Sequence, residues 1–250
     1  MYNAAKNRAS TIEIIKFLSE KGDYKQIDDG LLGACEVSNL EFIKYFAGLP
    51  NINVNCKDDD GNSPVLLLCA DDNADNEKLE FLCSLKPELN VRGRRERTPL
   101  QVLLENEQVT VGLVETLLKN GADVRLTGEN EKGMLYYAAY GKHSSLELVK
   151  LLLEHGAKDY DDGLVGACSS AKPNLAIIKL LVEKGGNPHV NDAARKNLLH
   201  LLCASDGVNE SILEYLFEIG VSTEEKEEWE GNNPLHVLCE NQNCLSKSRE

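Results

Sequence analysis

The sequence predicts an all-α solenoid in which short two-helix units stack side by side, and three observations support this prediction. A short apolar segment recurs along the chain at steps of 29 to 36 residues. A second apolar segment with helical spacing follows each copy, and glycines stand where several of these second segments end. Units of this kind bury their apolar faces only against their neighbours, so we expect them to form one stack.

The first helix of each unit is expected to begin at an anchor position, which is proline in three copies. Aligning the copies gives the anchors Gly30, Pro64, Pro99, Met134, Gly163, Leu198 and Pro234. The copies at Gly30 and Gly163 lack the proline and share an altered opening, residues 28–35 and 161–168. The steps into these two copies are the short ones, which predicts a shortened connecting hairpin before each of them.

The second helix of each unit is amphipathic, because its apolar residues recur at i, i+3, i+4 and i+7 and need a neighbour to cover them. The predicted second helices cover residues 12–18, 40–46, 79–85, 111–118, 146–153, 175–182 and 212–217. Gly121, Gly156 and Gly185 follow three of them, where a glycine in the left-handed conformation commonly ends a helix.

The repeats also have a longer period, which indicates that a block of four was duplicated. Equivalent positions lie 133 to 135 residues apart: Ala4 and Ala138, Gly30 and Gly163, Pro64 and Leu198, Pro99 and Pro234. We expect a long loop between the two helices of a unit at the same place in both copies, after Cys69 and after Cys203. This regularity favours a single continuous domain over residues 1–250.

The approximate repeats of this domain are residues 1–26 (partial), 27–60, 61–95, 96–130, 131–160, 161–194, 195–230 and 231–250 (partial). Both ends stop inside a repeat. Because a stack needs polar-faced units at its ends, this pattern fits either a fragment of a longer array or a protein with degenerate end caps.

With these repeats the chain resembles the ankyrin-repeat family over nearly all of its length. The family pattern is a glycine turn, Thr-Pro-Leu-His opening a first helix, a second helix and then Gly-Ala-Asp, and residues 97–123 and 231–239 match it best. The resemblance implies a solenoid with short hairpin tips that binds protein partners on a concave face. That face is built from the tips before each anchor and from exposed first-helix positions after it.

The resemblance, carried over position by position, assigns contact positions on this chain. The tip positions are Asp59, Asp60, Asn62, Arg94, Arg95, Arg97, Glu129, Asn130, Lys132, Trp229, Glu230 and Asn232, and the first-helix positions are Asp71, Glu105, Tyr140 and Glu240. From these we select the candidate partner-binding residues Asp59, Asp60, Arg94, Arg95, Arg97, Lys132, Tyr140, Trp229 and Glu230.

The segment of residues 91–98, here called the arginine tip, holds four of the eight arginines of the chain. The planar fork of arginine binds carboxylate and phosphate groups through two hydrogen bonds, which points to an acidic or phosphorylated peptide. The alternative is that the arginines offset the acidic residues 58–60 of the neighbouring tip, in surface pairs worth about 0–1 kcal/mol each.

Aromatic residues mark two further candidates. Trp229 is the only tryptophan and stands in the highly charged segment 223–230, so it is expected either to be an exposed interface anchor or to pack across its own hairpin. Tyr136, Tyr137 and Tyr140 open one first helix. At helical spacing at least one of the three is core, which leaves Tyr140 as the best contact.

The cysteines and histidines are expected to be structural. Five cysteines share one inner repeat position: Cys35, Cys69, Cys168, Cys203 and Cys239. A reduced cysteine packs there as a small apolar residue. His200 with Cys203 and His236 with Cys239 suggest a zinc site, but their helices should lie about 8–10 Å apart, too far for ligands about 2.0–2.3 Å from one ion. We expect no metal.

The formal charge of −14 disfavours nucleic acid and anionic membrane as partners, because phosphate contacts need Lys or Arg. The longest apolar stretches, such as residues 65–70, are far shorter than the about 20 residues of a bilayer span. The N-terminus lacks the apolar core of a secretory signal. We therefore expect an intracellular protein in the cytoplasm, with the nucleus as the alternative.

The sequence contains no phosphate-binding loop and no catalytic motif, so we expect neither an enzyme activity nor a cofactor. The first hypothesis is a monomeric, non-catalytic scaffold that binds a protein, or an acidic or phosphorylated peptide, on its concave face. The alternative is a targeting or autoinhibitory segment of a larger multidomain enzyme. Nucleic-acid binding through the arginine tip is a third hypothesis, which the charge disfavours.

Overall fold

The computed structural model describes residues 1–21 and 24–241, without the side chains of residues 24–26 and 129. This part of the chain is helical and contains no β-strand, and one isolated bridge joins Asn191 and Asn197. It is all-α and built of recurring helix pairs, as the repeats predict. Its contacts divide the chain into two compact units, residues 1–130 and 131–250. The single continuous domain expected over residues 1–250 stays a prediction.

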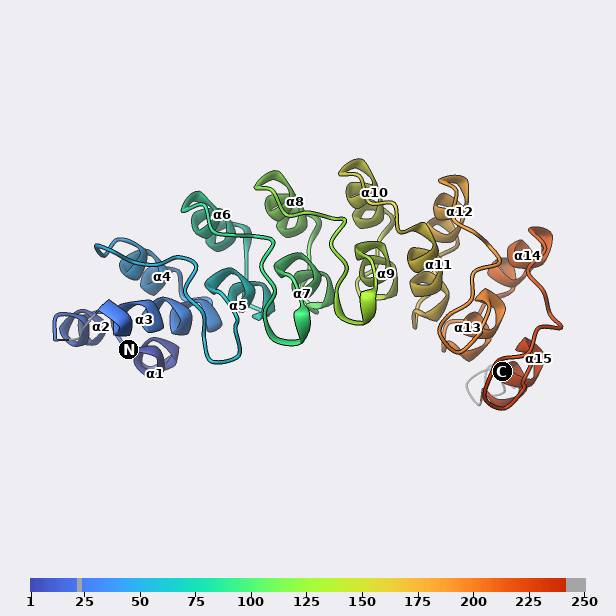
Figure 1. Cartoon of the computed structure of the whole chain (residues 1–250), viewed down its shortest axis with the longest axis horizontal. Helices are drawn as coiled ribbons and strands as arrows, with labels where there is room; N and C mark the ends of the chain where they lie inside the picture. The colour runs from blue at the N-terminus through green and yellow to red at the C-terminus, as the bar shows by residue number, and fades with distance from the viewer. Residues whose placement is uncertain (22–23, 242–250) are drawn as a thin grey trace, which may run out of the picture. The chain divides into compact units, whose positions relative to one another are not determined.

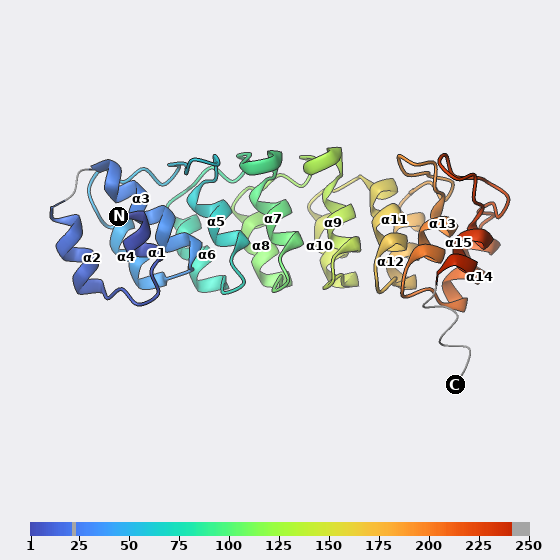
Figure 2. The same cartoon turned by 90° about the horizontal axis from the view of Figure 1, so that it is seen from below.

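The first unit contains eight α-helices among its described residues (Figure 1). They are α1 (Tyr2–Lys6), α2 (Ile12–Ser19), α3 (Tyr24–Glu36), α4 (Leu40–Ala47), α5 (Pro64–Ala70), α6 (Asn76–Ser84), α7 (Pro99–Glu105) and α8 (Val111–Lys119). The first helices α3, α5 and α7 form one row, and the second helices α4, α6 and α8 form another. Figure 2 shows the tips on one side of the helices and the loops within each helix pair on the opposite side.

The second unit repeats this arrangement. Its described helices are α9 (Met134–Tyr140), α10 (Leu146–Glu154), α11 (Tyr160–Ser169), α12 (Leu175–Glu183), α13 (Leu198–Ala204), α14 (Glu210–Glu218) and α15 (Pro234–Glu240). The first helices α9, α11, α13 and α15 lie in one row, with α10, α12 and α14 in the other. All seven predicted second helices are present, within one to three residues of the expected bounds.

Side chains and glycines set the ends of the second helices. Asn39, Asp75, Thr110, Ser145, Asn174 and Asn209 precede them, and each accepts a hydrogen bond from a backbone N–H of the first turn, which otherwise has no partner. At the other end, Gly121, Gly156 and Gly185 have φ angles of 102°, 92° and 105°, which confirms the predicted left-handed caps.

The two altered openings lack the usual tip, which confirms the predicted shortening. Only residues 155–159 separate α10 from α11, whereas residues 120–133 separate α8 from α9. Asp159 at the end of this short connection and Asp162 in the first turn of α11 instead accept hydrogen bonds from the start of α9. Asp162 Oδ2 accepts from the backbone N–H of Gly133 at 3.0 Å, and Asp159 Oδ2 accepts from that of Leu135 at 2.7 Å.

Glycine allows very close helix packing at both altered openings. An ideal Cβ on Gly166 of α11 would lie 2.5 Å from the backbone oxygen of Tyr136 in α9, and a Cβ on Gly33 of α3 would fall on the backbone oxygen of Tyr2 in α1. Any side chain at these positions would push the two helices apart. Gly33 and Gly166, three residues after the anchors Gly30 and Gly163, are therefore what lets these helices pack backbone to backbone.

Equivalent hydrogen bonds in the two units support the duplication. Asp28 Oδ1 accepts from the backbone N–H of Asn53 at 2.9 Å, and Asp161 Oδ1 accepts from that of Asn187 at 2.7 Å. The expectation of long loops after Cys69 and Cys203 is wrong. Residues 71–75 and 205–209 match 106–110, 141–145 and 170–174 in length. Polar residues in the first turns of α6 and α14 concealed where these helices begin.

Four of the five repeated cysteines pack as expected. Cys35, Cys69, Cys168 and Cys203 are buried, and burial raises the pKa of Cys168 to about 12. Cys239 is exposed, so the expectation that it is interior is wrong. The inner position is covered by the next repeat, and among the described residues no helix follows α15 to cover it.

Candidate functional site

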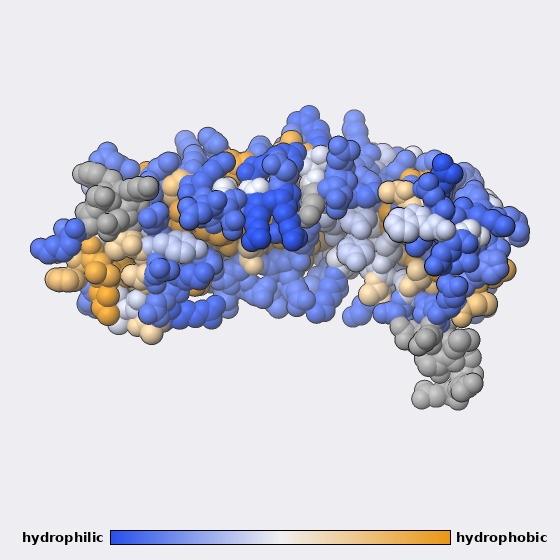
Figure 3. Space-filling view, turned by 60° about the horizontal axis from the view of Figure 1, so that its bottom comes forward, coloured by the Kyte–Doolittle hydropathy of each residue, from blue (hydrophilic) through white to orange (hydrophobic). Residues whose placement is uncertain are grey.

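The backbone of the arginine tip makes a tight 3-10 turn over Arg94–Glu96. Arg95 and Glu96 have φ angles of 59° and 58°, in the left-handed region. Asn62 of the preceding tip accepts a hydrogen bond from the backbone N–H of Arg94 at 3.1 Å, which fixes this tip against its neighbour. Figure 3 shows strongly hydrophilic side chains gathered in the region of this tip, beside α7.

Three of its four guanidinium groups have acceptors within the unit. Arg97 forms an ion pair with Glu105 at 2.7 Å, Arg92 donates to the backbone oxygen of Glu96 at 2.8 Å, and Arg94 lies 3.6 Å from Asp60. The structure thus brings Arg94 and Asp60 together, as the alternative interpretation of the tip expects. Among the described residues Arg95 has no such partner; it is exposed, as is Asp59.

Lys132 and Tyr140 lie in the second unit, on either side of Tyr136. Lys132 Nζ is 2.9 Å from Asp162 Oδ1 and 5.4 Å from the centre of the Tyr136 ring. The Tyr136 and Tyr140 rings stack with centres 5.4 Å apart. Tyr137 is buried and Tyr140 is 49% exposed, which confirms that one tyrosine of this group is core and leaves Tyr140 at the surface.

His200 holds two neighbouring repeats together. Its Nδ1 accepts from the backbone N–H of Asn197 at 3.3 Å, and its Nε2 donates to the backbone oxygen of Asn232 in the next tip at 3.0 Å. The ring is fully buried, so the structural role expected for this histidine is confirmed. Among the described residues no group of three His, Cys, Asp or Glu side chains is placed to hold a metal ion.

A buried carboxylate shapes the tip that carries Trp229. Glu227 accepts hydrogen bonds from the backbone N–H groups of Trp229 at 2.9 Å, Glu230 at 2.7 Å and Asn232 at 3.2 Å. These bonds, that of Trp229 first, lower the pKa of Glu227. The turn closes around Glu227 and leaves the Trp229 side chain 81% exposed. Of the two expectations for Trp229, the exposed position is therefore confirmed.

A groove of about 710 Å³ lies beside Trp229 and is here called the tryptophan groove. It is lined by Ala194, Lys196, Glu227, Trp229, Glu230, Asn232, Val237 and Glu240, from two adjacent tips and α15. The backbone N–H of Glu228 donates to the oxygen of Ala194 at 3.1 Å and holds the two tips together. Sequence reasoning found Trp229 and Glu230 but missed Ala194 and Lys196, because the adjacency of the tips appears only in the fold.

Two acidic side chains meet at this groove. Glu230 Oε2 and Glu240 Oε1 both accept from Asn232 Nδ2, at 3.0 and 3.5 Å. Neither carboxylate forms an ion pair with a described lysine or arginine. The groove therefore combines apolar side chains with two carboxylates that form no ion pair with a lysine or arginine of the described part of the chain.

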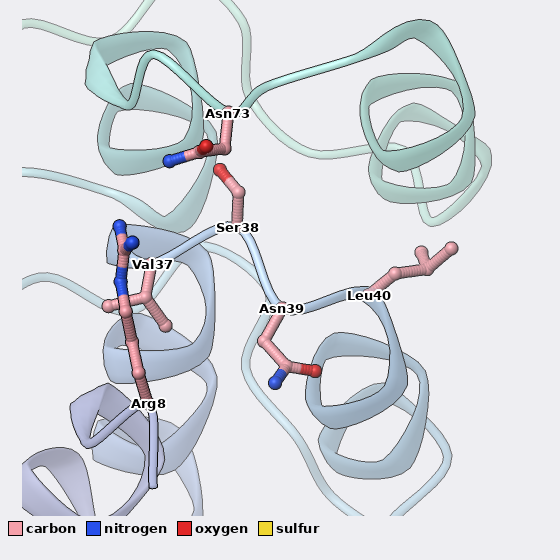
Figure 4. A pocket seen from close by; sticks show the side chains of 6 residues that line it. All are labelled: Arg8, Val37, Ser38, Asn39, Leu40 and Asn73. Carbon is pink, nitrogen blue, oxygen red and sulfur yellow. The ribbon is translucent and has the colours of Figure 1, made fainter.

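A second hollow, of about 400 Å³, lies in the first unit between three loops on the side away from the tips (Figure 4). It is lined by Arg8, Val37, Ser38, Asn39, Leu40 and Asn73. Ser38 is buried, and its hydroxyl has no hydrogen-bond partner among the described residues. None of the candidate residues chosen from the sequence lines this hollow.

The described helices are all too short or too polar to cross a membrane.

The repeats of this chain are similar to those of known proteins. A family model for ankyrin repeats in three copies matches residues 66–163 and 164–246. Inhibitor of Apoptosis OPG037 of Variola virus is 28% identical over 109 residues, which are 42% of this chain and 24% of that protein. The protein of the same name from Monkeypox virus gives the same values. The chain thus spans about a quarter of the length of these curated relatives.

Two solved structures share the fold at 18% identity. The ankyrin repeat domain of Bcl-3, a member of the IkappaB protein family, aligns with a TM-score of 0.61 over 83% of this chain and 92% of that chain. A chain from the complex of the Bdellovibrio bacteriovorus endopeptidase Bd0816 with the immunity protein Bd3460 aligns with a TM-score of 0.53 over 88% and 97%. These structures support the fold alone. Because the family model covers more than half of the sequence, the chain belongs to the ankyrin-repeat family.

Proposed function

We propose that the chain is a non-catalytic scaffold and that it binds a segment of a protein partner in the tryptophan groove. Ankyrin repeats generally mediate protein–protein interaction, and the fold is typically non-catalytic. The observation that carries the proposal is the 81% exposure of Trp229 beside the groove. An exposed tryptophan next to a concave surface is typical of the anchors that supply most of the binding energy at interfaces.

The rigidity of this tip favours binding. Three backbone hydrogen bonds to Glu227 and one between the tips fix the backbone under Trp229 before a partner arrives. A preformed surface loses little conformational entropy when it binds. The same reasoning applies to His200, which ties the tip to the repeat before it.

The arginine tip of the first unit is proposed as a separate contact for an acidic or phosphorylated segment. Among the described residues Arg95 is its exposed guanidinium without an acceptor, and Asp59 is a further candidate contact of the first unit. Lys132 and Tyr140 are candidate contacts of the second unit. Because Arg92, Arg94 and Arg97 already have acceptors, a partner at this tip would have to compete with them. We therefore rank this contact below the tryptophan groove.

The Variola virus and Monkeypox virus relatives match 42% of this chain. Inhibition of apoptosis is therefore said of those proteins alone, and only protein binding is proposed for this chain. A targeting or autoinhibitory segment of a larger enzyme, the alternative function, would use the same groove. Catalysis would then lie outside the repeats described.

Capture of partners from a cell lysate by the immobilised chain tests the proposal. We expect proteins that the unchanged chain retains to be lost with the W229A variant. The matched control is F217A, which removes another exposed aromatic, 48% exposed on α14, outside the groove. Retention of the same proteins by W229A would refute binding in the groove, and equal loss with F217A would point to general unfolding.

A further inference from the structure

We infer that the tryptophan groove selects a basic segment, with an arginine side chain of the partner lying between Trp229 and the carboxylates of Glu230 and Glu240. This inference rests on the proposed function and adds the chemistry of the occupant. It contrasts with the arginine tip, where the charge favours acidic partners. Three properties of the groove support it: its charge, the exposed indole of Trp229 and the apolar side chains among its lining residues.

The side chains that line the groove carry more negative than positive charge: Glu227, Glu230 and Glu240 against Lys196. Among the eight described lining residues, Lys196 is the one cation, and it acts on Glu227, whose pKa it helps to lower. The carboxylates of Glu230 and Glu240 converge on a single amide nitrogen of Asn232. Two like charges held together repel each other, and a cation placed between them relieves that repulsion.

The shape of the cation decides between arginine and lysine. A guanidinium is planar and offers several N–H donors, so it can reach two acceptors while its face stacks on an aromatic ring. The exposed indole of Trp229 is the aromatic ring that binds cations best. Ala194 and Val237 line the same groove and can contact the methylene groups of the side chain.

Other occupants fit the groove less well. An acidic or phosphorylated segment would add negative charge next to Glu230 and Glu240. A purely apolar segment would take water away from these two carboxylates without supplying a donor, which costs free energy. The unpaired carboxylates therefore discriminate against both classes, which is how a binding site becomes specific.

Because Trp229 is the only tryptophan, its fluorescence reports on this groove alone. The experiment titrates the chain with the acetylated, amidated peptide Gly-Arg-Gly-Arg-Gly, and with the same peptide carrying citrulline in place of arginine. Citrulline keeps the shape and most donors but has no charge. We expect a saturable change with the arginine peptide that weakens in high salt, and binding of the citrulline peptide about tenfold weaker.

Paired variants separate the local effect from net charge. The double variant E230Q/E240Q should bind the arginine peptide about fivefold to tenfold more weakly, because each exposed charge pair changes the affinity by a few-fold. The control E214Q/E218Q removes two charges from α14 outside the groove and should leave the affinity within about twofold. Far-UV circular dichroism confirms that both variants fold.

Three results would overturn the inference: equal binding of the arginine and citrulline peptides, equal weakening of arginine-peptide binding by the two double variants, or an unchanged affinity with E230Q/E240Q. Failure of the inference and failure of the proposed function are distinguishable. If partner capture depends on Trp229 while E230Q/E240Q leaves the peptide affinity unchanged, the groove binds protein but does not select a base. If W229A leaves capture unchanged, the proposed function itself fails.

Discussion

Replacing Gly166 with alanine puts a methyl group between two helices that pack backbone to backbone. An ideal Cβ there would lie 2.5 Å from the backbone oxygen of Tyr136 and 3.1 Å from its Cα. Favourable contacts between carbon atoms occur at about 3.5–4.0 Å, so α9 and α11 would have to separate by about 1 Å. Overpacking of this kind destabilises a protein by about 1–3 kcal/mol, whereas replacing a glycine within a helix by alanine stabilises it by about 1 kcal/mol. We expect the net effect of G166A to be a free energy of unfolding lowered by up to about 2 kcal/mol.

The variant G112A is the matched control for this prediction. Gly112 lies in the first turn of α8, and the nearest atom to its ideal Cβ is the side-chain nitrogen of Asn76 at 2.7 Å. Because Asn76 is exposed and its side chain can move, G112A should raise the free energy of unfolding by up to about 1 kcal/mol.

Urea unfolding followed by circular dichroism measures both changes, and hydrogen exchange shows which unit has changed. A stability gain with G166A equal to that with G112A would refute the packing of α9 on α11.

Three further predictions concern single side chains. H200A should lower the free energy of unfolding by about 2–4 kcal/mol in urea, because a buried ring and the bond to the next tip are lost; no change would contradict the link. Burial raises the pKa of Asp159 above its ordinary 3.8 in the folded chain, so its carboxylate disfavours folding progressively as pH rises through the folded pKa. The D159N variant keeps an acceptor for the backbone N–H of Leu135 but carries no charge. Its free energy of unfolding, relative to that of the unchanged chain, should therefore be higher at pH 7 than at pH 3. A difference that does not change with pH would contradict this. In a C244S background, Cys239 should react quickly with a thiol reagent and Cys168 only on unfolding; fast reaction of Cys168 in the folded chain would contradict its burial.

The sequence predicts the repeats well because each second helix carries its apolar face in local spacing. Leu113, Val114 and Leu117 are all buried, as the pattern over residues 111–118 requires. The wrong predictions concern residues whose burial depends on a neighbouring repeat. Cys239 has the same local pattern as Cys203 but no described helix beyond it, and burial depends on that neighbour.

The candidate site is only partly readable from the sequence. Trp229 and Glu230 stand out because an isolated aromatic in a charged segment has no helical partner to bury it. Ala194 and Lys196 lie more than thirty residues earlier, and only the packing of adjacent tips brings them to the same groove. The acceptors that hold Arg94 and Arg97 are likewise set by tip geometry, which the arginine spacing does not specify.

The most direct test of partner binding in the tryptophan groove is hydrogen exchange of the chain with and without a captured partner. The account predicts slower exchange of backbone amides in residues 192–196 and 227–240, where two tips and α15 line the groove. Protection confined to other parts of the chain, with residues 227–240 unchanged, would contradict it.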